Sequence, residues 1–151
     1  KKLKIFLSRQ NAKYRNLINQ DDISKMLKKN GFEVIDPNTM TIFEQIEIFS
    51  KAEIIIGPTC SALSNAIFSA EGAKLIEIKP KYQFKYETGF RDRYLELCSL
   101  LNINYSFVEA DPIESEKYDK NILKYISKKA YEESNYYKDL LLEKNKIKNI
   151  I

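Results

Sequence analysis

Two arginines and one short turn carry the side chains best suited to binding an anion. Arg9 and Arg15 follow the first apolar segment, and guanidinium groups form forked, charge-assisted hydrogen bonds with diphosphates. The turn Pro58-Thr59-Cys60-Ser61 leads into a segment that we expect to be helical, and the unpaired amides at a helix start favour phosphate. In the alternative interpretation, Ser61 only caps that helix and the arginines are solvated or paired at the surface.

The 151-residue chain contains no histidine, which limits the catalysis that it can perform alone. Neither Ser-His nor Cys-His activation of a nucleophile is available, and the usual histidine zinc sites are excluded. Cys60 is therefore better interpreted as a small packing residue than as a nucleophile. Glu77 is a candidate acceptor for ribose hydroxyls, with an ion pair to Lys79 as the alternative.

Composition and charge describe an ordinary globular domain. Hydrophobic residues make up 44% and charged residues 30% of the chain, and no apolar run approaches the ~20 residues of a membrane span. The formal charge of +4 is modest and argues only weakly for nucleic acid, so we expect no nucleic-acid partner. Two cysteines, Cys60 and Cys98, indicate reduced thiols and a cytoplasmic location rather than a disulfide framework.

Five apolar segments separated by helical patterns predict the framework that positions these residues. We expect strands at Leu3 to Ser8, Phe32 to Ile35, Ile54 to Ile56, Lys74 to Ile78 and Ile103 to Val108. The third should end at Gly57-Pro58 and the fourth before Pro80. Strands that alternate with helices form βαβ units, so the predicted fold class is α/β: a Rossmann-like parallel sheet of about five strands with helices on both faces.

Capping signals mark the predicted helices. Asn19 is a candidate cap for the first, which Gly31 closes, and Thr41 with Glu44 has the form of a capping box. A short helix is expected from Ser61 to Phe68, with Ser61 as its cap. Beyond Asp111-Pro112 we expect two helices, broken near Ser134-Asn135, of which the last is lysine-rich.

Ligands bind such sheets beyond the carboxyl ends of the strands, near the switch point of the strand order. The loops Arg9 to Gln20, Pro58 to Asn65 and Ile78 to Phe84 should therefore open on one edge of the sheet. This placement favours function over a purely structural role for the side chains in these loops.

Five short motifs in register extend this interpretation over about half of the chain. They are Ser8-Arg9, Arg15 with Asn19-Gln20, Gly31-Phe32-Glu33, Glu44-Gln45, and the segment from Gly57 to Asn65, with the order retained through Glu77. The pattern resembles that of the family 61 glycosyltransferases, which have Gly-x-His-Gly-Ala-x-Leu-x-Asn where this chain has Gly57 to Asn65.

The resemblance implies the donor-binding, C-terminal half of a GT-B-type enzyme. A nucleotide-sugar donor would bind without a cofactor or metal ion, and the glycan acceptor would be held by a missing N-terminal domain. The implied reaction is an inverting transfer to a surface or capsular glycan. The substrate-binding residues would be Arg9, Arg15, Asn19, Gln20, Thr59, Cys60, Ser61, Asn65 and Glu77. Residues 1–135 would form the domain, and the helix at 136–151 would pack poorly on it, leaving the helix available to the missing domain.

Three departures from the family pattern leave a second hypothesis open. Gln20 stands where the family usually has Glu, and Thr59 and Cys60 stand where it has His and Gly. These substitutions favour a non-catalytic module that binds nucleotide sugars or serves assembly but has lost the chemistry. A third, weaker alternative is a generic nucleotide-binding or partner-docking domain without a sugar substrate.

Overall fold

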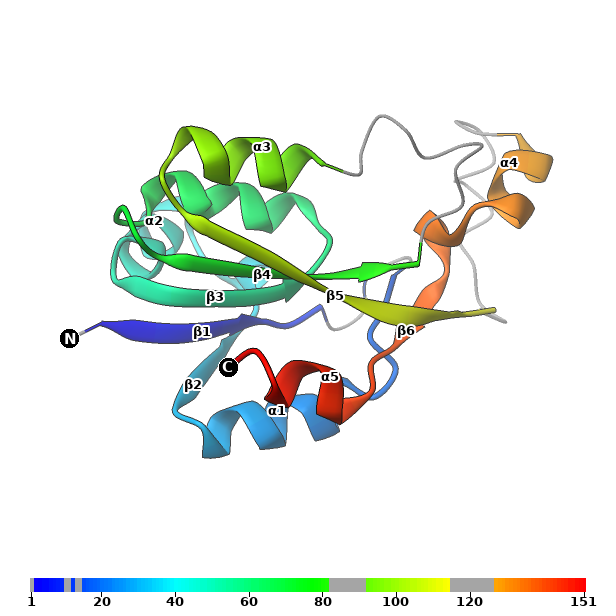
Figure 1. The fold of residues 1–151 in the computed structure, drawn as a ribbon, viewed down its shortest axis with the longest axis horizontal. Helices are drawn as coiled ribbons and strands as arrows, with labels where there is room; N and C mark the ends of the chain where they lie inside the picture. Colours follow the sequence, from blue (N-terminus) through cyan, green and yellow to red (C-terminus); the bar gives the residue numbers. More distant parts are fainter. Residues whose placement is uncertain (1, 10–11, 13–14, 82–91, 115–126) are drawn as a thin grey trace.

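A mostly parallel six-stranded sheet forms the centre of the molecule (Figure 1). The computed structural model describes residues 2–9, 12, 15–81, 92–114 and 127–151. The strands are β1 (Leu3–Leu7), β2 (Phe32–Ile35), β3 (Ala52–Pro58), β4 (Lys74–Pro80), β5 (Asn104–Ile113) and β6 (Asp139–Leu141), in the order β2-β1-β3-β4-β5-β6. Each strand is parallel to its neighbours along the run β2-β1-β3-β4-β5, and β6 is antiparallel to β5. The predicted α/β class is confirmed, and the five expected strands are parallel, whereas the antiparallel β6 was not predicted.

Helices cover both faces of the sheet (Figure 1). The α-helices are α1 (Gln20–Lys29), α2 (Ile42–Ser50), α3 (Arg93–Leu100), α4 (Lys128–Glu133) and α5 (Lys144–Lys148), and the 3-10 helices are η1 (Pro37–Thr39), η2 (Ser61–Phe68) and η4 (Asn135–Tyr137). The α2 and α3 helices lie on one face, and α1 and α5 lie on the other. The strand order reverses between β1 and β3, so the switch point lies at the carboxyl ends of these two strands.

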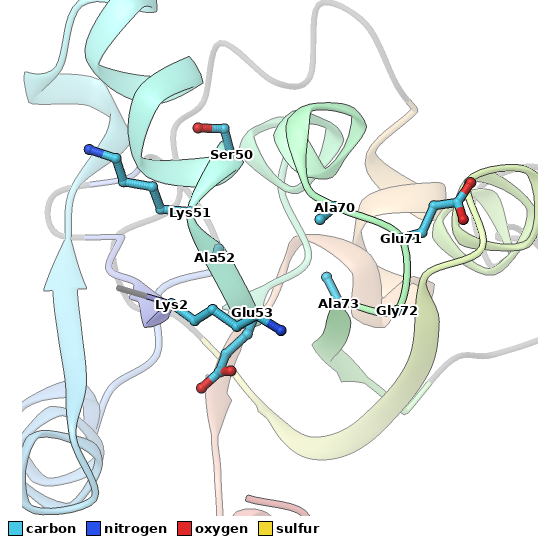
Figure 2. A pocket seen from close by; sticks show the side chains of 9 residues that line it. All are labelled: Lys2, Ser50, Lys51, Ala52, Glu53, Ala70, Glu71, Gly72 and Ala73. Atoms are coloured by element: carbon cyan, nitrogen blue, oxygen red, sulfur yellow. The ribbon is translucent and has the colours of Figure 1, made fainter.

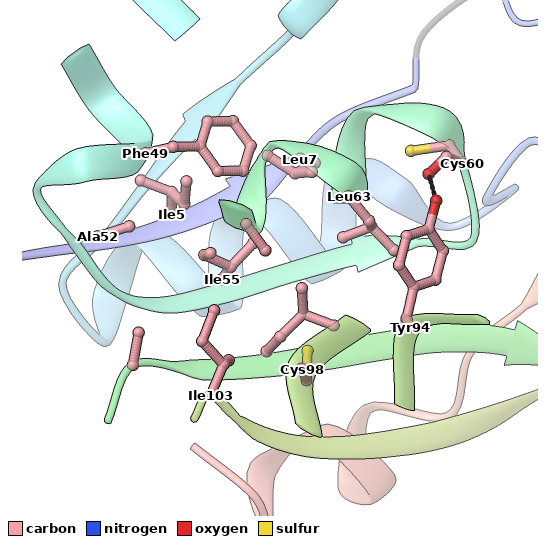
Figure 3. Close-up of a cluster of buried hydrophobic side chains, with 13 residues drawn as sticks. Ile5, Leu7, Phe49, Ala52, Ile55, Cys60, Leu63, Tyr94, Cys98 and Ile103 are labelled. Carbon is pink, nitrogen blue, oxygen red and sulfur yellow. Dashed lines mark hydrogen bonds between the residues drawn. The ribbon is translucent and has the colours of Figure 1, made fainter. Parts of the chain in front are cut away.

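Each face of the sheet has its own hydrophobic core. Ile55 of β3 packs with Phe49 of α2 and Leu63 of η2 (Figure 3). The next residue, Ile56, packs on the opposite face with Ile23 of α1 and with Ile147. Because successive strand residues point to opposite faces, the apolar run in β3 is explained by burial on both sides, as expected for a central strand.

The local signals in the sequence are confirmed at two helices. The Thr41 hydroxyl accepts a hydrogen bond from Glu44 N at 3.3 Å, and Glu44 Oε2 accepts one from Thr41 N at 2.7 Å, which completes the capping box of α2. The Glu44 carboxylate also accepts a hydrogen bond of 2.8 Å from the Thr41 hydroxyl. Its bonds from Thr41 N and from this hydroxyl lower the pKa of the carboxyl, because they favour its charged form. Gly31 follows α1 with a φ of 81°, a left-handed conformation that glycine adopts without strain.

Three strands run longer than the sequence suggests, and each contains a proline in one of its last two positions. β3 includes Pro58, β4 includes Pro80, and β5 continues through Pro112. A proline near a strand end removes only one donor from the ladder, so it does not stop the strand before it. The prediction that Ser61 caps its helix is also wrong, because Cys60 holds the cap position and Ser61 is the first residue of η2.

The C-terminal segment differs most from expectation. The predicted helix at 136–151 is replaced by η4, the short strand β6 and the five-residue α5. The expectation of poor packing is wrong as well, because Leu140, Leu142 and Ile147 are fully buried in the core shared with α1. Pairing with the edge of β5 overrides the helical propensity of this segment. The break near Ser134-Asn135 is confirmed, and the division of the chain at residue 135 stays a prediction.

Candidate functional site

The register of the sheet brings the loops after β1 and β3 together at the switch point. Phe6 pairs with Ile56, so Arg9 and Thr59, each three residues further on, lie level with one another. Arg9 Nη1 lies 3.5 Å from the carbonyl oxygen of Thr59. The expected convergence of these loops is therefore confirmed for the described residues. Residues 10, 11, 13, 14 and 82–84 of the predicted loops lie outside them.

Gln20 fixes the backbone at the end of β1. Arg9 N donates a hydrogen bond of 2.8 Å to Gln20 Oε1, and Gln20 is buried at the start of α1. The side chain that stands in place of the family's Glu thus already has a structural partner. This contact couples the first turn of α1 to the position of Arg9.

Gly57 allows β3 to approach β1 closely beside the site. A Cβ atom at this position would lie 2.9 Å from Leu7 Cβ, a separation that real Cβ atoms essentially never show. A larger residue would therefore push the two strands apart where Arg9 and Thr59 meet. The glycine of the predicted motif serves close packing here.

A buried carboxylate lies directly behind Thr59. Glu77 is 1% exposed and accepts hydrogen bonds from the hydroxyls of Thr59 and Tyr105, the latter at 2.6 Å. Thr59 N also donates to Ile78 O at 2.8 Å, so Thr59 is held by its backbone and by its side chain. The proposed contact of Glu77 with ribose hydroxyls stays a prediction, and it would compete with these two hydrogen bonds.

Tyr94 and two free thiols extend this buried group toward α3. The Tyr94 hydroxyl donates to the carbonyl oxygen of Cys60 (Figure 3), and desolvation by burial raises the pKa of Tyr94. Cys60 and Cys98 are both free and buried. Cys60 belongs to the core cluster, which agrees with its interpretation as a packing residue. Sequence reasoning missed Tyr94 and Tyr105, because their proximity to Glu77 depends on the packing of α3 and β5 on β4.

Both candidate asparagines hold other parts of the chain. Asn65 Nδ2 donates to Gln45 Oε1 at 2.7 Å, and Gln45 in turn donates to the Pro37 carbonyl at 2.9 Å, which ties η2 to α2 and η1. Asn19 occupies the cap position of α1 but makes no capping bond, because its side chain binds the backbone of Leu142. The capping prediction for the Asn19 side chain is therefore wrong.

Arg15 differs from Arg9 in its surroundings. Arg15 is only 4% exposed and has a left-handed backbone with a φ of 57°, whereas Arg9 is half-buried at the strand end. Its truncation would affect packing as well as charge, so Arg9 is the cleaner probe of anion binding. Ser61 is exposed at the first residue of η2, where its hydroxyl is accessible from the same edge as Arg9.

Alkaline pH should destabilise the protein through Cys98. Burial, together with the charge of Glu77, raises the pKa of the Cys98 thiol from 9.0 to about 11. As the pH rises, the thiol ionises at a lower pH in the unfolded state than in the folded state. The contribution of Cys98 to the free energy of unfolding is therefore fully present below about pH 9 and is lost toward pH 11. Urea denaturation at several pH values across this window should show that the free energy of unfolding falls more steeply with pH for the parent than for Cys98→Ala. Equal slopes would contradict the raised pKa of Cys98.

A pocket is hollowed at the opposite, amino-terminal edge of the sheet (Figure 2). It is lined by the start of β3 and by the turn that precedes β4, and it includes Lys51, Glu53 and Glu71. Charged side chains of both signs line it, and the residues that follow β1 and β3 lie at the other edge. It is therefore separate from the candidate site.

The comparison with protein families decides the assignment. The glycosyltransferase 61 family model matches residues 1–76, half of the chain. The chain belongs to the glycosyltransferase 61 family. The match covers β1 to β3 and part of β4, with every candidate residue except Glu77, which follows directly. No curated protein matches the sequence significantly.

Family membership supports glycosyltransferase activity in general, with a sugar donor and an acceptor as substrates. Within the described part of the chain, no helix is long and apolar enough to cross a membrane. Among the same residues, no group of three or more Cys, Asp or Glu side chains is arranged to hold a metal ion.

Proposed function

We propose that this chain is the nucleotide-sugar donor-binding domain of a family 61 glycosyltransferase. The observation that supports this proposal most is the contact between the Arg9 side chain and the Thr59 carbonyl oxygen. It joins the ends of β1 and β3 at the switch point of the sheet, inside the family-matched segment. Open α/β sheets bind ligands at such points. The donor's diphosphate would lie over the carboxyl ends of these strands.

Arg9 is proposed to bind the diphosphate and stabilise it as the leaving group. A guanidinium offers forked, charge-assisted hydrogen bonds, and charge that develops on the leaving oxygen makes such contacts stronger in the transition state. Ser61, exposed at the start of η2, would add a hydroxyl contact. Arg15 is proposed to contribute positive charge from its buried position in the segment between β1 and α1.

The remaining features of the proposal come from the family resemblance. We expect a GT-B-type arrangement in which a separate N-terminal domain holds a surface or capsular glycan, with inversion at the sugar carbon and no metal ion. The free, buried thiols of Cys60 and Cys98 fit a cytoplasmic location. The chain by itself should bind a nucleoside diphosphate without transferring sugar.

A non-catalytic binding or assembly module is the second candidate, and two contacts favour it. Gln20 Oε1 is engaged with Arg9 N, and the Thr59 hydroxyl donates to buried Glu77. Both positions, which have Glu and His in the family pattern, thus serve structure here. A longer form of the protein that binds donor but transfers no sugar to any glycan would support this candidate.

A thermal-shift screen tests donor binding. The chain is heated with UDP, GDP, CDP or ADP, and with the corresponding monophosphates as controls. A diphosphate at 100 times its Kd should add about 2.7 kcal/mol to the free energy of unfolding, or roughly 5 to 10 °C for a chain of this size. Monophosphates should shift the melting temperature less. No shift with any of the four diphosphates would contradict the proposal.

A further inference from the structure

The C-terminal segment lies against the loop that leads from β1 to α1. Ile18 N donates to Leu140 O at 2.9 Å, and Leu140 N donates to Asn16 O at 2.8 Å. Leu17 and Leu140 form a parallel bridge, and both side chains are buried. One edge of β6 therefore pairs with β5, while the other holds this loop.

Side chains strengthen this contact at both ends. Asp139 Oδ1 accepts hydrogen bonds from Asn16 N at 2.8 Å and from Asn16 Nδ2 at 3.2 Å. At the other end, Asn19 Nδ2 donates to Leu142 O at 2.8 Å, and Leu142 N donates to Asn19 Oδ1 at 3.2 Å. Residues 16–19 are thus fixed to the C-terminal segment by backbone and side-chain bonds together.

Two residues of the proposed site flank the held residues 16–19. Arg15 directly precedes Asn16 and has a φ of 57°, which a non-glycine residue keeps only where its surroundings hold it. Gln20 directly follows Asn19, and its Oε1 fixes Arg9 N. Increased mobility of residues 16–19 would therefore change the position of Arg15 directly and that of Arg9 through Gln20.

We infer that Asp139 is a positioning residue for the donor site, acting through Asn16 on the segment that links Arg15 to Gln20. This inference rests on the proposed donor-binding function. It places part of the site's framework in a segment more than sixty residues beyond the family-matched residues 1–76. The C-terminal segment, expected to serve a missing domain, instead shapes the site of its own domain.

Three variants test the role of Asp139. Asp139→Ala removes the acceptor of both Asn16 bonds, and Asp139→Asn keeps an oxygen at the same place. Asn104→Ala is the matched control, because it removes a side-chain bond of 3.2 Å to Gly72 O at the amino edge of the sheet. Hydrogen exchange at the amides of Asn16 and Ile18 and calorimetric titration with UDP, GDP, CDP and ADP are measured for each.

Asp139→Ala should raise exchange at these two amides and weaken diphosphate binding by roughly tenfold. Asp139→Asn and Asn104→Ala should stay close to the parent in both measurements. Unchanged exchange in Asp139→Ala, or raised exchange with unchanged affinity, would overturn the inference. An equal loss of affinity in Asn104→Ala would overturn it too, since it would mark a general effect of stability.

The two proposals fail in different ways. A parent chain that binds none of the four diphosphates would overturn the proposed function. In that case the exchange at Asn16 and Ile18 still decides whether Asp139 holds the loop, because that measurement needs no ligand. Unchanged exchange alongside normal diphosphate binding would overturn the role of Asp139 alone.

Discussion

Replacing Ile55 by alanine is expected to lower the free energy of unfolding by about 2 to 5 kcal/mol. Ile55 is fully buried at the centre of β3, in contact with side chains from β1, α2 and η2. Truncation removes three carbons there, and the close-packed surroundings relax only partly around the cavity. Urea denaturation of parent and variant measures the difference.

Ile42→Ala is the matched control for this experiment. Ile42 begins α2 and is 54% exposed, so the same truncation should change stability by about 0.5 kcal/mol or less. A loss below about 1 kcal/mol for Ile55→Ala would contradict the assignment of β3 as the central strand. Any effect of Ile55→Ala on ligand binding should be explained by the unfolded fraction alone.

Glu77→Ala should destabilise the protein by about 1 to 3 kcal/mol. The variant leaves the buried hydroxyl of Thr59 without its acceptor and removes one partner of the half-buried Tyr105 hydroxyl, and a buried unsatisfied group costs about 1 to 3 kcal/mol. Glu77→Gln keeps the volume and one acceptor oxygen, so its loss should be smaller. Thermal and urea denaturation measure both variants.

Glu71 provides the control for the buried carboxylate. Glu71 is exposed at the opposite edge of the sheet, so Glu71→Ala should leave stability nearly unchanged. Equal stability of Glu77→Ala and Glu71→Ala would contradict a structural role for Glu77. A Glu77→Gln variant with parental stability but weaker diphosphate binding would instead favour the predicted contact with ribose.

The sequence predicted the parallel strands and the meeting of two loops because these features depend on local patterns. The continuous apolar run in β3 and the capping box at Thr41 each follow from neighbouring residues. Arg9 was placed at a strand end by the pattern before it. The strands are parallel and adjacent, and the register that pairs Phe6 with Ile56 then places Thr59 beside Arg9.

Features that depend on distant partners could not be predicted in the same way. Asn19 looks like a helix cap, but its side chain binds Leu142, 123 residues away. The Leu140 segment looks helical by composition, yet it pairs with β5 as a strand. Glu77 was recognised as a candidate, but its hydroxyl partners come from β3 and β5, and sequence spacing does not reveal which side chains face it.

Calorimetric titration of a nucleoside diphosphate into the parent and Arg9→Ala tests the central claim most directly. Loss of charge-assisted hydrogen bonds should cost ~1.5 to 3 kcal/mol, a weakening of about tenfold or more. Lys28→Ala is the control, because Lys28 is exposed near the far end of α1. This variant should bind the diphosphate as tightly as the parent does. Both variants should melt close to the parent. Equal affinity of Arg9→Ala and the parent, or no binding by the parent, would contradict a donor site at the ends of β1 and β3.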